Sequence, residues 1–197
     1  MKIPQLALAL LLCAPAAFGQ ARVVQFRSAE DPNSPADPAV CAAAPFAANL
    51  RLGGSLYTYE VGEKRGTVDT SESRRIGKAT ACAQITSFLF PEGISQLFYV
   101  QLTLPDGVYT GTGSCTIVSN KVPQAGLVLA GCSLKLIAFP PNVIGGAVVS
   151  LSTFNPFRLA GFTTGSYWTV QVYDQATPAT DLGDSDRAME WSTGESE

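Results

Sequence analysis

Cys115 and Cys132 lie in two glycine-rich, apolar segments on either side of a turn at Pro123–Gln124. Folding the chain back symmetrically about this turn places the two cysteines opposite each other. Because side chains alternate between the two faces of a strand, each cysteine then shares a face with neighbouring apolar residues. A slip of one residue would move one cysteine to the other face, so a disulfide would also fix the register. Residues 108–136 therefore predict a β-ribbon locked by a disulfide.

The first residues have the pattern of a secretory signal peptide. A positive charge stands near the start, an apolar run follows at Leu6–Cys13, and small residues precede a cleavage site after Gly19 or Ala21. The apolar run is about half of the roughly 20 residues that a membrane-spanning helix needs. Bulky leucines before Cys13 disfavour a lipid-attachment site. We therefore expect residues 1–19 to be a cleaved signal peptide, with a secreted or periplasmic protein and no membrane span.

Four cysteines follow the predicted cleavage site, namely Cys41, Cys82, Cys115 and Cys132. In an exported chain they indicate two disulfides, for which three connectivities are possible. The hairpin argument favours Cys115–Cys132, which leaves Cys41–Cys82 as the second pair. A zinc site is disfavoured, because the chain has no histidine and no C-x-x-C pair. We expect two disulfides, no metal and no other cofactor.

The absence of histidine also limits the possible chemistry. It excludes Ser-His-Asp hydrolases and any mechanism with a histidine general base, and it leaves a free thiol without its usual activating partner. The Gly145-Gly146 pair is not a phosphate loop, since no lysine follows it and no helix pattern begins there. The sequence therefore shows no recognisable catalytic set.

Charge is unevenly distributed along the chain. The formal net charge is −3, but acidic residues dominate 174–197, where Arg187 is the single basic residue. The remaining chain is close to neutral and has no basic stripe of the kind that nucleic-acid binders carry. We therefore expect no nucleic-acid partner, and we expect residues 174–197 to form a disordered acidic tail.

The rest of the chain shows strand alternation and turn signals rather than helical periodicity. Residues 20–49 are interpreted as an N-terminal arm and loop, and residues 50–173 as a β-barrel domain. Within the arm, Arg22–Ser28 is interpreted either as a short first strand or as an ordered extension. The other strand-like segments are Leu50–Val61, Arg74–Phe90, Leu97–Leu104, Val108–Ser119, the second half of the ribbon, Gly145–Phe154 and Ser166–Tyr173. For Arg74–Phe90 we expect one long bent strand, or a strand with a bulge near Ala81–Ala83.

Seven or eight antiparallel strands joined mostly by hairpins predict an all-β protein. An up-and-down barrel of about eight strands leaves no exposed edge, and its interior is wide enough to hold one small ligand. A two-sheet β-sandwich is the alternative and would use the same strands. Glycines that recur within the strands favour the barrel, because tight coiling of a sheet needs them.

The order of the segments also resembles a known group of proteins. A strand ending in a PDG turn is followed by TGTGSC, LAGCSLKL, GGAVVSLSTFNP and GSYWTVQVY. This succession, over Leu50–Tyr173, resembles the allene oxide cyclase and dirigent group of eight-stranded, calycin-like barrels. The resemblance implies a barrel that binds hydrophobic substrates inside and either steers radical coupling or cyclises a reactive intermediate without a metal or organic cofactor. It assigns no catalytic residue in this chain.

Candidate catalytic residues are Glu60, Tyr57 and Tyr59. A carboxylate among tyrosines is what acid–base chemistry needs when histidine is absent. By alternation, however, Glu60 lies on the opposite strand face from the two tyrosines. An exposed glutamate paired with Arg74 or Arg75 is the alternative, since structural ion pairs have the same appearance in a sequence.

Candidate ligand-binding residues are Tyr99, Gln101, Tyr109 and Trp168. Trp168 belongs to an apolar face of the last strand, and it is interpreted either as core or as part of a cavity wall. The two tyrosines and Gln101 would supply polar groups to such a cavity, and they are equally ordinary on the outside of a sheet.

Three functions are consistent with the sequence. The first is a secreted, disulfide-stabilised barrel that binds a small apolar molecule in its interior. The second is a cofactor-free cyclase or isomerase of the barrel group named above. The third is an interaction protein that works through its surface. The sequence does not indicate an oligomeric state.

Overall fold

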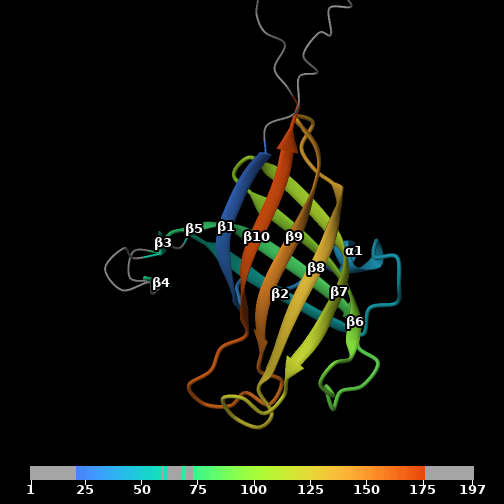
Figure 1. Cartoon of the computed structure of the whole chain (residues 1–197), viewed down its shortest axis with the longest axis vertical. Helices are drawn as coiled ribbons and strands as arrows, with labels where there is room; N and C mark the ends of the chain where they lie inside the picture. Colours follow the sequence, from blue (N-terminus) through green and yellow to red (C-terminus); the bar gives the residue numbers. More distant parts are fainter. Residues whose placement is uncertain (1–20, 59, 62–67, 70–72, 176–197) are drawn as a thin grey trace, which may run out of the picture. The chain divides into compact units, whose positions relative to one another are not determined.

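The computed structural model describes residues 21–58, 60–61, 68–69 and 73–175. Most of this chain forms one closed, antiparallel β-barrel of eight strands (Figure 1). The predicted signal peptide, Tyr59 and residues 176–197 of the predicted acidic tail lie outside the described residues. The all-β prediction and the preference for an up-and-down barrel over a sandwich are confirmed.

The barrel strands follow the chain in a simple meander. They are β1 (Ala21–Glu30), β2 (Leu50–Tyr57), β5 (Arg75–Gln84), β6 (Ser95–Leu104), β7 (Gly107–Ser119), β8 (Val128–Ala138), β9 (Val143–Phe154) and β10 (Gly165–Asp174). Around the barrel their order is β1-β10-β9-β8-β7-β6-β5-β2. The remaining elements are a short helix, α1 (Pro38–Ala42), and a separate pair of two-residue strands, β3 (Glu60–Val61) and β4 (Val68–Asp69).

Strand β1 closes the barrel. It pairs with β10 from Ala21 opposite Tyr173 to Ala29 opposite Gly165, and its last residues pair with β2. Figure 1 shows β1 (blue) and β10 (red) side by side. The barrel therefore starts before residue 50, because without β1 the strands β2 and β10 would each leave an unpaired edge.

Both predicted disulfides are formed. Cys115 and Cys132 lie directly opposite each other in the β7–β8 register, with Cα atoms 4.0 Å apart. Cys41 of α1 is bonded to Cys82 of β5, and this bond fixes the N-terminal arm on the outside of the barrel. The ribbon predicted from alternation is thus observed with the predicted register.

The expectation of one strand over Arg74–Phe90 is wrong at its C-terminal end. Strand β5 stops at Gln84, and its pairing with β6 is regular through 81–83. The strand ends there because the Asn49 side chain binds the backbone of Ile85: the amide oxygen accepts from Ile85 N–H at 2.7 Å, and the amide nitrogen donates to Ile85 C=O at 2.9 Å. The chain then leaves the sheet as a loop.

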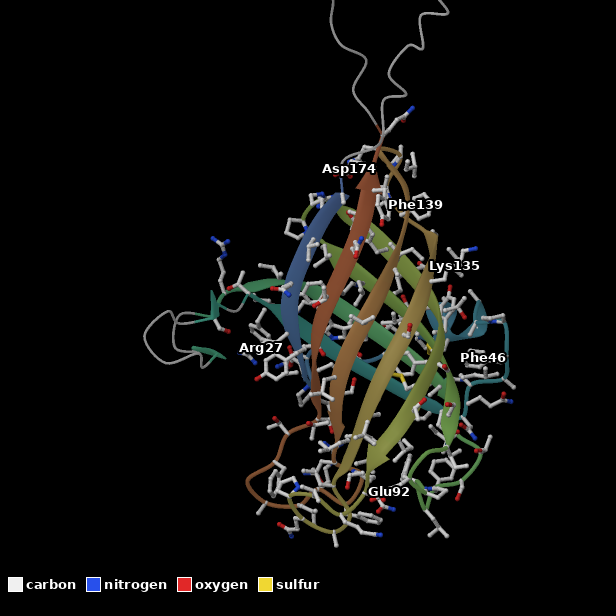
Figure 2. All side chains as sticks on the ribbon, viewed as in Figure 1. Arg27, Phe46, Glu92, Lys135, Phe139 and Asp174 are labelled. Atoms are coloured by element: carbon white, nitrogen blue, oxygen red, sulfur yellow. A yellow bond between two sulfur atoms is a disulfide. The ribbon has the colours of Figure 1, made fainter. Side chains whose placement is uncertain are left out.

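The two ends of the barrel differ. At the closed end, the turns at 105–106 and 139–142 meet the free ends of β1 and β10; at the hollow end lie loops 85–94, 120–127 and 155–164. In Figure 2, Asp174 marks the closed end and Glu92 the hollow end. Large buried side chains fill the closed half: Phe26, Leu56, Val100, Leu102, Leu104, Tyr109, Leu134, Leu136, Val143, Val148, Val170 and Val172.

The N-terminal arm covers part of the outer surface of β2, β5 and β6. The absence of a side chain at Gly53 permits the contact, since a Cβ there would overlap the backbone of Ser34. The Asp37 side chain caps α1 by accepting from Ala39 N–H at 2.9 Å. Tyr99, on the outer face of β6, is buried beneath the arm with Val40 and the Cys41–Cys82 disulfide.

Candidate ligand cavity

The hollow half of the barrel contains an apolar cavity that is partly open to solvent. Its volume is about 110 Å³. This volume is smaller than the apolar cavity of about 150 Å³ that holds a benzene molecule in another protein, but the cavity is partly open, so a small organic molecule can extend out of it.

Small side chains at inward positions create this space. On β5 the inward residues are Ala79, Ala81 and Ala83. On β7 and β8 the Cys115–Cys132 disulfide and Ala130 take inward positions, followed toward the loops by Ile117 and Val128, and all of these residues line the cavity. In the closed half, leucine and valine take the inward positions of β6, β8, β9 and β10, so larger side chains fill that half.

Trp168 forms part of the cavity wall next to the filled half. It is 3% exposed, and its ring stacks on Phe26 with centroids 6.5 Å apart. Its indole Nε1–H donates to Ser28 Oγ at 2.9 Å. The one polar atom of this side chain is therefore satisfied, and the ring presents only carbon to the cavity.

A short chain of hydroxyls lies along β9 and β10. Ser166 Oγ donates to Ser152 Oγ at 2.7 Å, and Ser150 Oγ lies 3.2 Å from Ser152 Oγ. Ser152 and Ser166 line the cavity. Because these hydroxyls bind one another, this wall places little uncompensated polarity against an apolar ligand.

Gln96 lies across the ring from these serines, since β6 stands opposite β10 in the eight-strand order. It lines the cavity and is 2% exposed. Its Oε1 accepts from Thr86 N–H at 2.8 Å and from Thr86 Oγ at 3.2 Å. Its Nε2 has no hydrogen-bond partner.

Phe90 and Phe154 line the cavity at the hollow end, with ring centroids 5.5 Å apart. Phe90 has φ 47°, a left-handed backbone that is uncommon for a bulky residue. Asn120 Nδ2 binds the Phe90 carbonyl at 3.1 Å and so joins loop 85–94 to loop 120–127. This bond helps to hold the strained residue, and with it the ring, beside the cavity.

Glu30 is the single carboxylate among the described residues that line the cavity. It forms a bidentate ion pair with Arg158 of loop 155–164, in which both N···O distances are 2.9 Å. Its charge is therefore compensated by Arg158 rather than offered to a ligand inside.

The closed end carries a different polar cluster. Arg22 binds Asp174 at 3.0 Å and Asp106 at 2.9 Å. The hydroxyl of Tyr109, whose side chain is 1% exposed, donates to Asp106 at 2.7 Å and accepts from Arg22 at 3.3 Å.

The closed-end cluster shifts the pKa of two of its members. Burial, followed by the hydrogen bond to Asp106, raises the pKa of Tyr109 above its ordinary value. The bonds to Asp174 and Tyr109 raise the pKa of Arg22 further above its already high value. The cluster binds strand ends together.

Of the three catalytic candidates, Tyr57 is the one whose side chain the structure describes. Tyr57 is half-buried, and the guanidinium carbon of Arg27 lies 4.6 Å from the centre of its ring. Tyr59 lies outside the described residues. Glu60 belongs to β3, where its backbone pairs with Asp69. Tyr57 is absent from the described cavity wall.

The ligand-binding candidates are widely separated. Trp168 lines the cavity, Tyr99 lies beneath the arm outside the barrel, and Tyr109 belongs to the closed-end cluster. Gln101 is half-buried and alternates with the inward residues of β6. Sequence reasoning missed Gln96, although a signal was present: a lone amide stands two residues before the apolar stripe that begins at Phe98.

The described residues contain no group of three or more side chains placed to hold a metal ion. No helix in the described ranges is long and apolar enough to cross a membrane. The fold and cavity define a disulfide-bonded, eight-stranded antiparallel barrel, compatible with a calycin-like fold. Comparison of the sequence with protein-family models and with curated proteins found no match.

Proposed function

We propose that this protein binds a small, mainly apolar molecule in the hollow end of its barrel. One observation carries the proposal: the apolar cavity of about 110 Å³, whose wall is built from alanine, valine, aromatic and disulfide groups. Removing apolar surface from water contributes about 25 cal/mol per Å², so a ligand that fills this space gains affinity without ion pairing.

Loops at the hollow end support entry of such a ligand. Phe88, Leu89, Val122 and Phe157 are each more than half exposed, and they belong to the three loops of this end. Exposed apolar side chains gathered at one end of a molecule are typical of a contact site for an apolar partner or ligand. We propose that they form the entry side of the cavity.

We further propose that the protein acts outside the cytoplasm. Residues 1–19 have the sequence pattern of a signal peptide, and two disulfides fit an oxidising compartment. Both features favour a secreted or periplasmic binding protein.

The binding proposal is tested by titrating the purified protein with ethylbenzene and following the indole Nε1–H signal of Trp168 by NMR. We expect saturable binding in the wild type and its loss in Ala81→Leu, because the larger side chain occupies the cavity. Absence of saturable binding to the wild type would refute the proposal and favour an interaction protein that works through its surface. Native mass spectrometry of protein from its own host, with organic extraction, then identifies the natural ligand class.

The enzymatic alternative is a cofactor-free cyclase or isomerase of the allene oxide cyclase and dirigent-like group. Such chemistry needs an acid or base next to the bound molecule. The described wall offers Glu30, which is already paired with Arg158, so we place binding before catalysis. Chemical conversion of the extracted ligand on incubation with the protein would instead favour the enzymatic function.

A further inference from the structure

Gln96 is the one cavity-lining side chain, among those the structure describes, with a buried nitrogen or oxygen that lacks a partner. The orientation of its amide follows from chemistry. Thr86 N–H can only donate, so the amide atom 2.8 Å from it must be the oxygen. The amide NH₂ is then the unpaired group.

Three other polar side chains of the wall are already paired. Ser152 and Ser166 bind each other, and the indole N–H of Trp168 binds Ser28. Buried N–H groups in proteins are almost always paired, because an unmade hydrogen bond leaves the desolvation penalty uncompensated. A trapped water needs two to four polar partners, and the apolar surroundings of this amide favour another source of the acceptor.

We propose that the ligand carries a neutral carbonyl oxygen that accepts a hydrogen bond from Gln96 Nε2. This inference rests on the proposed function, since it specifies the chemistry of the molecule bound in the same cavity. A neutral acceptor is favoured over a carboxylate because no lysine or arginine is among the described lining residues. A buried, unpaired carboxylate would also bear a large desolvation cost.

The ligand class is therefore a compact ketone, ester or lactone with an apolar body. The body lies against the alanines of β5 and the ring of Trp168, and the carbonyl is directed at the start of β6. The Thr86 bonds fix the amide in advance, so little side-chain freedom is lost when the ligand binds.

The test uses two probes of similar shape, acetophenone and ethylbenzene, of which only the first has a carbonyl. Their affinities are measured by calorimetry or NMR for the wild type and for Gln96→Leu. We expect the ratio of acetophenone to ethylbenzene affinity to fall about tenfold in the variant. Retained ethylbenzene binding shows that the variant cavity is intact. Gln25→Leu, an exposed glutamine on β1, is the matched control and leaves the ratio unchanged.

The outcomes separate the two proposals. If both probes bind and Gln96→Leu leaves their ratio unchanged, the carbonyl inference is wrong while binding in the cavity stands. If neither probe binds the wild type, the proposed function fails and the inference with it. If Gln96→Leu abolishes binding of both probes, the more conservative Gln96→Glu keeps the acceptor for Thr86 and replaces the donor. Acetophenone binding to that variant as tight as to the wild type would overturn the inference.

Discussion

The closed and hollow ends of the barrel use the same strands in different ways. At the closed end, inward leucine and valine side chains fill the space, and the hydroxyl of Tyr109 is bound by Arg22 and Asp106. At the hollow end, the inward positions of β5 are alanines and the amide of Gln96 keeps an unpaired N–H. One end satisfies both packing and hydrogen bonding internally, and the other leaves both incomplete.

This difference shows how one half of an up-and-down barrel can supply the packed core while the other half supplies a cavity. Alternation fixes which residues point inward, and the size of those residues then decides whether a stretch of the barrel is core or cavity. Substitutions at equivalent inward positions of the two ends should therefore have unequal consequences.

Truncation gives the largest expected effect. Leu102 is fully buried in the closed half, whereas Leu52 is half-buried and borders the cavity. Leu102→Ala should destabilise the protein by about 4 kcal/mol, because it removes a well-packed side chain and leaves a void. Leu52→Ala should cost about half as much or less, since part of its side chain already faces empty space. Urea unfolding of both variants measures the difference.

Equal losses of unfolding free energy in these two variants would refute the difference in packing between the two ends, because they would mean that the hollow end is as tightly packed as the closed end. Leu97→Ala, at a half-exposed position on β6, serves as a control for the loss of leucine as such.

Replacing small inward side chains by larger ones should have an intermediate effect on the free energy of unfolding. Here the filled half has no room for the added atoms, whereas the hollow half does. Val148 is fully buried in the closed half, so Val148→Phe overpacks it at a cost of about 1–3 kcal/mol. Ala81→Leu adds its extra carbons to the cavity, so its free energy of unfolding should stay within about 1 kcal/mol of the wild type. Thermal unfolding measures both variants. A large loss of stability in Ala81→Leu would show that the space cannot accept a leucine.

Much of this arrangement could be predicted from the sequence. Alternation around Cys115 and Cys132 gave the register of the central ribbon, and the remaining cysteines gave the second disulfide by elimination. The end of β5 could not be predicted, because it depends on Asn49, a residue distant in sequence whose side chain binds Ile85. Local strand propensity does not record such a competing partner.

The candidate site was less accessible to sequence reasoning. Tyr99 and Tyr109 are both buried, but one lies beneath the arm and the other in an ion-pair cluster, and neither environment is visible in a strand pattern. The cavity itself arises where small inward residues of several strands meet at one level of the barrel. Recognising that level requires the stagger between strands, which only the register supplies.

The smallest predicted effect concerns the pH dependence of the closed end. The pKa of Tyr109 is raised above its ordinary value of 10.0, first by burial and then by its bond to Asp106. The folded protein therefore holds the phenolic proton more tightly than the unfolded chain does. The corresponding stabilisation is complete below about pH 10 and is lost as the pH rises through the pKa of the folded state.

Tyr109→Phe should accordingly lower the free energy of unfolding at neutral pH by about 1 kcal/mol, through loss of the bond to Asp106, and it should flatten the decline in stability above about pH 10. Urea unfolding at a series of pH values measures the slope, with Tyr173→Phe, a half-exposed tyrosine on β10, as the control. An alkaline slope as steep in Tyr109→Phe as in the wild type would show that another group governs the loss of stability.

Ethylbenzene binding by Tyr109→Phe should stay at the wild-type level, because the polar cluster that anchors Tyr109 lies at the other end of the barrel. A change in that affinity would show that the two ends are coupled.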